Sequence, residues 1–173
     1  MKKNLLVAAL MTAGVLSASA FAADGKINFV GAITDDACTV VNDMSNPLTV
    51  TLGTVSSKAF TTIGSTAAPT KFTIALTNCP ATMTSAKVKF DGTADANEGS
   101  ILALTQEAGV ATNVGIQLTD KANVVVPLYT ASSSYALVPG ANNLDFVARY
   151  YSTAASVTAG PANSTSNFTI IYN

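Results

Sequence analysis

The sequence predicts an all-β domain, an antiparallel sandwich or barrel with almost no helix. Short runs rich in Thr, Val, Ile and Phe are separated by Gly, Asn, Asp and Pro, which is typical of strands joined by turns. No segment keeps an apolar period of 3.6 residues through three turns, so no long helix is expected. The last expected strand, 166–172, is followed only by Asn173, with no turn and no further strand. We therefore expect a sheet with one uncovered edge.

Residues 1–22 have the pattern of a secretory signal peptide. Lys2 and Lys3 give a positive start, residues 5–15 are apolar, and residues 20–22 (Ala-Phe-Ala) supply the small residues that a signal peptidase requires. A transmembrane anchor would need about 20 apolar residues, and this run is shorter. We therefore expect this segment to be removed and the rest of the chain to be exported.

The composition excludes several classes of function. The 173 residues carry 9 Lys and Arg against 10 Asp and Glu, so no excess of positive charge is present to hold a nucleic-acid backbone. With 49% hydrophobic and only 11% charged residues, the chain is far from the disordered class. So low a charge also suggests that much of the surface is covered in the working state.

The two cysteines, Cys38 and Cys79, lie in the exported part, where oxidising conditions allow a disulfide. We expect them to pair. Closing a loop of about 40 residues stabilises a fold by roughly 3 to 4.5 kcal/mol in the chain-entropy model. Zinc binding is a poor alternative, because the chain has no histidine and the spacing matches no zinc motif. Two buried free thiols are the remaining alternative.

Strand patterns continue along the whole exported chain. Residues 72–77 and 144–151 alternate clearly, so each has one face for the core. A short helical turn is expected near 57–60, and the Ala-, Ser-, Thr- and Gly-rich stretch 152–167 is expected to be a long loop. The nine expected strands cover residues 38–41, 48–52, 71–77, 86–91, 101–104, 114–118, 124–128, 143–151 and 166–172.

A further strand is expected beside the new N-terminus. One face of this run carries Gly25, Ile27, Phe29 and Gly31. The other face carries the residues between them, Lys26, Asn28 and Val30. The run begins within three residues of the expected cleavage site and is separated from Cys38 by a short segment. A strand in this position is free to leave its own domain.

The last strand has an apolar face and an exposed edge. Phe168, Ile170 and Tyr172 share one face, and no charge, proline or bulge protects the edge between Phe168 and Asn173. An alternating apolar strand at one end of the chain thus matches an uncovered edge at the other. Pairing the two between molecules is a head-to-tail contact, which generates a filament.

Several motifs occur in order along the chain. They are Gly-Lys-Ile-Asn-Phe-Val-Gly at 25–31, Ala-Cys-Thr-Val at 37–40, Asn-Cys-Pro at 78–80, Val-Gly-Ile-Gln-Leu at 114–118 and Ala-Arg-Tyr-Tyr at 148–151. Tyr172 is the penultimate residue and Gly160 is the fourteenth from the C-terminus. In these features, and over residues 23–173, the chain resembles chaperone-usher pilins, in particular the type 1 fimbrial subunits of Gram-negative bacteria.

The resemblance implies an incomplete immunoglobulin-like sandwich that lacks its last strand, with a donor-strand extension at 23–31 and a pilin domain at 32–173. A periplasmic chaperone is expected to lend a strand to the open groove. At an outer-membrane usher, the extension of the next subunit would then replace it. The implied donor residues are Ala23, Gly25, Ile27, Phe29 and Gly31. The implied acceptor-strand and chaperone-contact residues are Gly160, Phe168, Ile170 and Tyr172.

The expected function is a structural subunit of an adhesive fimbria (pilus) on the cell surface, polymerised by donor-strand exchange. A minor adaptor or a carbohydrate-binding adhesin of the same kind of fimbria is the alternative. We expect no enzyme activity, cofactor, nucleic acid or small-molecule substrate. Asp35 and Asp36 are adjacent carboxylates, but neighbours on a strand point to opposite faces. Tyr150 and Tyr151 resemble a sugar-stacking platform, but one is expected to face the core.

Overall fold

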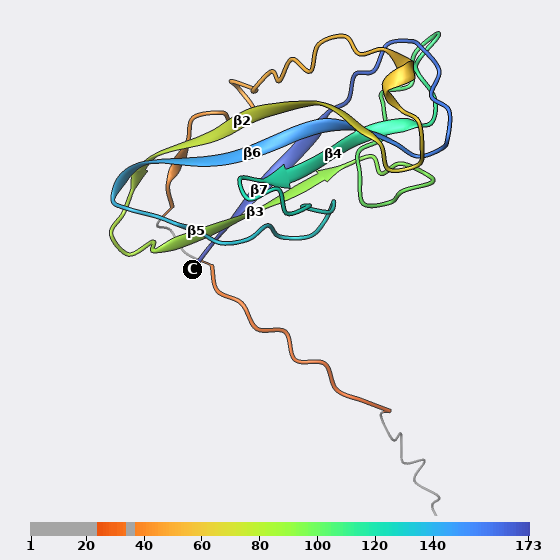
Figure 1. The fold of residues 1–173 in the computed structure, drawn as a ribbon. Helices are drawn as coiled ribbons and strands as arrows, with labels where there is room; N and C mark the ends of the chain where they lie inside the picture. The colour runs from red at the N-terminus through yellow and green to blue at the C-terminus, as the bar shows by residue number, and fades with distance from the viewer. Residues whose placement is uncertain (1–23, 34–36) are drawn as a thin grey trace, which may run out of the picture. The chain divides into compact units, whose positions relative to one another are not determined.

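The computed structural model describes residues 24–33 and 37–173, and each part is described by itself. In the second part, seven strands and one turn of 3-10 helix form two antiparallel sheets that pack face to face (Figure 1). One sheet has the strand order β1-β2-β6-β4 and the other β5-β3-β7. The elements are β1 (Thr39–Val40), η1 (Ser57–Ala59), β2 (Thr66–Cys79), β3 (Ser85–Gly92), β4 (Val114–Asp120), β5 (Tyr135–Ala136), β6 (Gly140–Ser152) and β7 (Ser166–Tyr172).

The long β2–β6 ladder forms the centre of the first sheet. Phe72 lies opposite Phe146, and Ile74 lies opposite Leu144, so the predicted alternation places both apolar faces on the core side. The register shifts between Ala67 and Thr70, where Pro69 has no N–H to donate to a ladder. A second register shift lies between Leu76 and Cys79, and the ladder is continuous from Thr70 to Leu76.

Six of the nine predicted strands overlap observed ones, and the turn near 57–60 is confirmed as η1. The predicted strands at 48–52, 101–104 and 124–128 are wrong. The second and third each meet the edge of β4 at a single bridge, Leu102 to Ile116 and Val125 to Thr119, and neither forms a ladder with it. The sequence does not predict β5, because two residues are too few to show an alternation.

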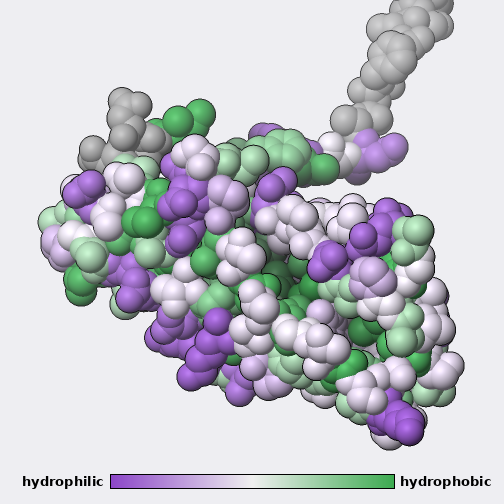
Figure 2. Space-filling view, turned by 90° about the horizontal axis from the view of Figure 1, so that it is seen from above, coloured by the Kyte–Doolittle hydropathy of each residue, from purple (hydrophilic) through white to green (hydrophobic). Residues whose placement is uncertain are grey.

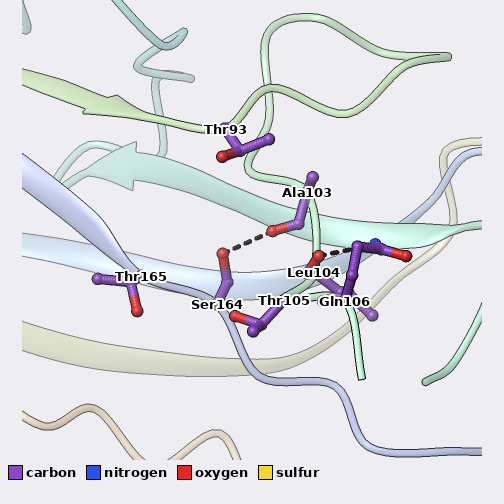
Figure 3. A pocket seen from close by; sticks show the side chains of 7 residues that line it. All are labelled: Thr93, Ala103, Leu104, Thr105, Gln106, Ser164 and Thr165. Atoms are coloured by element: carbon purple, nitrogen blue, oxygen red, sulfur yellow. Dashed lines mark hydrogen bonds between the residues drawn. The ribbon is translucent and has the colours of Figure 1, made fainter. Parts of the chain in front are cut away.

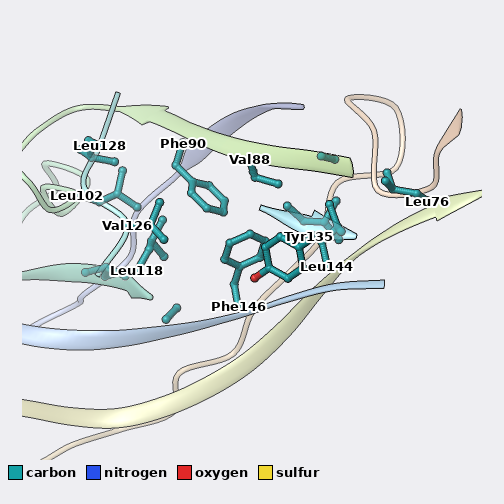
Figure 4. Packing of buried hydrophobic residues seen from close by; sticks show 14 of the residues in the cluster. Leu76, Val88, Phe90, Leu102, Leu118, Val126, Leu128, Tyr135, Leu144 and Phe146 are labelled. Atoms are coloured by element: carbon teal, nitrogen blue, oxygen red, sulfur yellow. The ribbon is translucent and has the colours of Figure 1, made fainter. Parts of the chain in front are cut away.

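An aromatic cluster fills the space between the sheets (Figure 4). The Phe90 ring on β3 meets the Phe146 ring on β6 edge to face, with centroids 5.0 Å apart, and Phe72 stacks on Phe146 at 5.7 Å. The hydroxyl of Tyr135 donates to the carbonyl of Asp145 at 2.6 Å, and burial raises the pKa of this phenol to about 12. The cluster therefore joins β2, β3, β5 and β6 in one core.

Asp120 is buried at the end of β4. Its carboxylate accepts hydrogen bonds from the Ser133 hydroxyl at 2.6 Å and from the backbone N–H groups of Val124 at 2.9 Å and Ala122 at 2.8 Å. Burial alone would raise the pKa of Asp120, but these bonds and the charge of Lys121 outweigh it and lower that pKa below its ordinary value. The ionised carboxylate thus stabilises the turn after β4.

Acid is expected to destabilise the fold through Asp120. Because its pKa is lower in the folded state, the stability it contributes is full above the unfolded-state pKa of about 3.9 and is lost as the pH falls through the folded-state pKa. Asp120→Asn should lower the free energy of unfolding at about pH 7 by roughly 1 to 3 kcal/mol and flatten its acid dependence. Urea denaturation at several pH values measures both effects. The exposed control Asp24→Asn should change neither, and a parent-like acid dependence in Asp120→Asn would contradict the assignment.

Candidate strand-binding groove

β7 has one paired edge and one unpaired edge. It pairs with β3 from Ser166 to Tyr172, and no described strand lies on its other side. Phe168, Ile170 and Tyr172 are half-buried and pack against the core, as their alternation predicts. The residues between them face outward and carry no charge. An apolar edge without charge, proline or bulge is open to pairing with a further strand.

Residues 47–55 form a second unpaired segment. Val50, Leu52 and Val55 pack against the core, and Thr49 and Thr51 are exposed, so the segment keeps the alternation of a strand. Within the described part of the chain, no backbone hydrogen bond reaches any residue from 47 to 55. The strand predicted at 48–52 is therefore missing because no neighbouring strand supplies the ladder.

The two unpaired segments border one opening, which we call the acceptor groove. At one end, the backbone of Cys38 lies close to the phenol of Tyr172, whose pKa is raised by burial and is partly lowered by that backbone. At the other end, residues 53–57 face residues 157–163, which lead into β7, across one cavity. The chain from Cys38 onward thus runs antiparallel to the chain that ends at Tyr172. Their facing edges share no backbone hydrogen bond.

Figure 2 shows hydrophobic residues in a hollow on the face seen from above, bordered by more polar residues. The cavity at the β7 start has a volume of about 300 Å³. Val55, Phe60, Val114 and Val157 line it with apolar side chains, and Ser57, Thr158 and Asn163 add polar groups, so it can take a small aliphatic side chain beside polar groups. The Tyr150 hydroxyl donates to the carbonyl of Ala162 at 3.3 Å beside it. Tyr150 therefore packs inward, as expected for one residue of the Tyr150–Tyr151 pair.

Gly160 lies before β7 and not within it. A Cβ atom on Gly160 would lie 2.1 Å from the carbonyl oxygen of Gly109 and 2.7 Å from the backbone nitrogen of Ala111. Hydrogen bonds on both sides hold the two loops at this distance, from the Ala111 N–H to the Pro161 carbonyl at 2.9 Å and from the Thr105 N–H to the Asn163 carbonyl at 2.7 Å. Gly160 therefore permits a close backbone contact that shapes the wall of the cavity.

The expected donor residues are exposed in the extension. Ile27 is 78% exposed and Phe29 is 92% exposed, whereas Ala23 lies outside the described residues. The prediction missed Ile33, which is fully exposed. Ile33 continues the period-two series two residues beyond Gly31, so the alternation itself contained the signal for it. The extension therefore presents three large apolar side chains on one face.

A second cavity, of about 240 Å³, offers no comparable chemistry (Figure 3). Its Ser164 hydroxyl donates to the carbonyl of Ala103 at 2.6 Å, and the Gln106 amide donates to the carbonyl of Leu104 at 3.0 Å, so these two polar groups are bonded within the wall. Over residues 24–33 and 37–173, no cluster of acidic, Cys and His side chains could hold a metal ion. In the same ranges, the structure has no helix with the length and apolarity to span a membrane. The Asp35–Asp36 pair lies outside them.

A family model described as "Fimbrial protein" matches residues 27–173, nearly the whole of both described parts. The chain belongs to the fimbrial protein family. Long polar fimbria protein A of Salmonella typhimurium is 38% identical, over 99% of this chain and 97% of its own length. The type-1 fimbrial protein C chain of Escherichia coli is also 38% identical, over 86% of this chain and 83% of its own.

Solved structures support the same family. The type I fimbria protein of Burkholderia pseudomallei superimposes with a TM-score of 0.61 at 37% identity, over 86% of this chain and 97% of that one. The P pilus rod subunit PapA gives a TM-score of 0.64 at 20% identity, over 79% and 99%, which is evidence for the fold alone. The fold is an incomplete immunoglobulin-like sandwich that lacks its last strand, and the protein is a structural fimbrial subunit. The adhesin alternative is not favoured.

Gly160→Ala is expected to destabilise the wall of the acceptor groove. The added methyl group cannot be accommodated without moving the backbone of residues 109–111, and such overpacking typically costs about 1 to 3 kcal/mol. Gly99→Ala is the matched control, because a Cβ atom at Gly99 meets nothing within 4 Å. Urea denaturation of both variants measures the difference. Equal stability of the two would show that the contact at Gly160 is not tight in solution.

Proposed function

We propose that this fimbrial subunit polymerises head to tail by inserting residues 25–33 into the acceptor groove of the next copy. One observation carries the proposal. β7 and residues 47–55 present facing backbone edges without partners, and the extension is an exposed, alternating apolar strand. An inserted strand satisfies both edges at once, which a side chain or a small ligand cannot do.

Burial and backbone pairing both favour this joint. Ile27, Phe29 and Ile33 are exposed in the extension, and burying each contributes about 1.5 to 3 kcal/mol. Each main-chain hydrogen bond formed with β7 or with residues 47–55 adds about 0.5 to 1.5 kcal/mol. Gly25 and Gly31 bring no side chain, so the inserted backbone can approach the groove closely at these two positions. Such a joint dissociates slowly.

The cavity at the start of β7 favours one direction of insertion. In an antiparallel register that sets Ile27 opposite Ile170, Ile33 lies opposite Ser164, beyond the start of β7 and next to Asn163, which lines the cavity. In the parallel direction, Ala23 would lie there instead. A single methyl group fills little of a cavity of about 300 Å³, whereas an isoleucine side chain fills much more of it. We therefore assign the cavity to Ile33 of the neighbouring copy.

The same groove needs a temporary occupant before assembly, because an open apolar edge promotes aggregation. A periplasmic chaperone that lends a strand to β7, replaced by the next extension at an outer-membrane usher, meets this need. The family membership supports this route. Residues 1–22, which lie outside the described residues, would direct the chain to the periplasm, and the finished fimbria would stand on the cell surface. Strand pairing requires no catalytic group, cofactor or small-molecule substrate.

Phe29→Asp is expected to block donation while sparing acceptance. The variant loses the free energy that burial of the aromatic ring contributes to the joint. It must also bury an unpaired carboxylate in the groove, which is unfavourable. Filament formation, measured as denaturant-resistant ladders on gels of unheated samples, should fall by more than about tenfold. The complex with the chaperone should form normally. Val30→Asp is the matched control, because Val30 lies on the opposite face of the same strand and is equally exposed. Equal ladders from the two variants would exclude Phe29 as a groove residue.

The direction of insertion can be tested by crosslinking. Ile33→Cys combined with Val157→Cys should give a disulfide between neighbouring copies in assembled fibres, because Val157 lines the cavity assigned to Ile33. Ala23→Cys combined with Val157→Cys should not. Mass spectrometry of digested fibres identifies the crosslinked peptides. The reverse result, in which the Ala23→Cys variant crosslinks and the Ile33→Cys variant does not, would establish parallel insertion.

A further inference from the structure

Tension in a head-to-tail filament would enter and leave each subunit at two places. It leaves through the chain that connects the donated extension to Cys38, and it enters through the strand held between β7 and residues 47–55. We propose that the Cys38–Cys79 disulfide diverts this tension away from residues 39–56, and so protects a subunit's own acceptor groove when its extension is pulled. This inference rests on the proposed function and adds a mechanical role to it.

The chain after Cys38 is weakly attached by its backbone. β1 contains only Thr39 and Val40, which pair with Thr77 and Leu76. One further bond follows, from the Val41 N–H to the Ala75 carbonyl at 2.9 Å. Residues 47–55 then make no backbone hydrogen bond with any described residue. Tension applied to this chain alone would therefore break a few bonds one after another.

The segment at risk is also one side of the acceptor groove. Val50, Leu52 and Val55 hold it against the core by apolar contact alone, and the next fully buried residue is Phe60, after η1. Peeling the chain as far as residue 56 would remove one of the two edges that hold the neighbour's strand. Without the disulfide, pulling on one joint of a subunit would thus open its other joint.

The disulfide, which confirms the predicted pairing of the two cysteines, offers a stronger anchor. Cys79 is the last residue of β2, a strand of 14 residues that pairs with β6 from Thr66 to Cys79. Tension transferred from Cys38 to Cys79 is resisted by this ladder and by the apolar side chains that β2 places in the core. A pull on the extension then no longer loads the backbone of residues 39–56. Both cysteines are buried, so reductants reach the bond only after the chain around it opens.

The test is to stretch assembled filaments at constant force in the presence of a phosphine reductant. If the bond carries tension, its reduction rate should rise with the applied force. Each reduction should release up to about 60 Å, the extended length of roughly 18 residues from 39 to 56 at about 3.3 to 3.6 Å each. Rupture of the filament should follow at the same subunit. A reduction rate independent of force, or filaments that survive reduction without lengthening, would overturn the proposal.

A variant without the bond gives a second measurement. Filaments in which Cys38→Ser and Cys79→Ser are combined should lengthen by the same step before they rupture, with no reductant present. A disulfide that only stabilised the fold would instead give rupture at lower force in a single step, which would also overturn the proposal. If the variant does not assemble, the reductant experiment decides alone. The proposed strand donation is tested separately. If strand donation is wrong, the Phe29→Asp variant should assemble normally.

Discussion

A backbone edge without a partner governs this structure. β7 completes its ladder on one side only, and residues 47–55 follow a strand-like path with no ladder at all. The apolar side chains of both segments are nevertheless seated on the core. The groove between them therefore needs main-chain donors and acceptors as well as apolar side chains. A polypeptide strand supplies both, which is why strand donation explains the groove better than a small ligand does.

The rest of the domain keeps the two edges in place. The β2–β6 ladder and the aromatic cluster around Phe146 fix the sheet beneath them. The loops joined at Gly160 hold the chain that leads into β7. Because the walls of the groove are already fixed, few of its side chains and loops lose conformational freedom when a strand enters. The entropy cost of binding is therefore small, and the affinity for the strand is higher.

The sequence predicts the parts of this system that depend on alternation. Ile27 and Phe29, Ile74 and Leu76, and Phe168 and Ile170 each reveal a face because side chains on a strand have a period of two residues. Alternation reports burial, however, and not hydrogen bonding. The apolar cluster at 101–104 is likewise predicted as a strand, although Leu102 makes only isolated bridges, to Ala94 and Ile116, whereas β2 has a long ladder. The contact at Gly160 depends on a loop about 50 residues away in the sequence, and no local pattern contains it.

In the proposed filament, one short segment would connect the two joints of each subunit. The chain from Cys38 to residue 56 would begin where the donated extension ends, and it would finish as one edge of the groove that receives the neighbour's strand. An edge that must bond to an incoming strand cannot also be fully bonded to its own domain. Residues 47–55 can accept a strand because their backbone groups are unpaired. For the same reason, they are attached only weakly to their own domain. A covalent link from Cys38 to the end of β2 resolves this conflict, because it fixes the start of the segment without using any of the backbone groups that the groove needs.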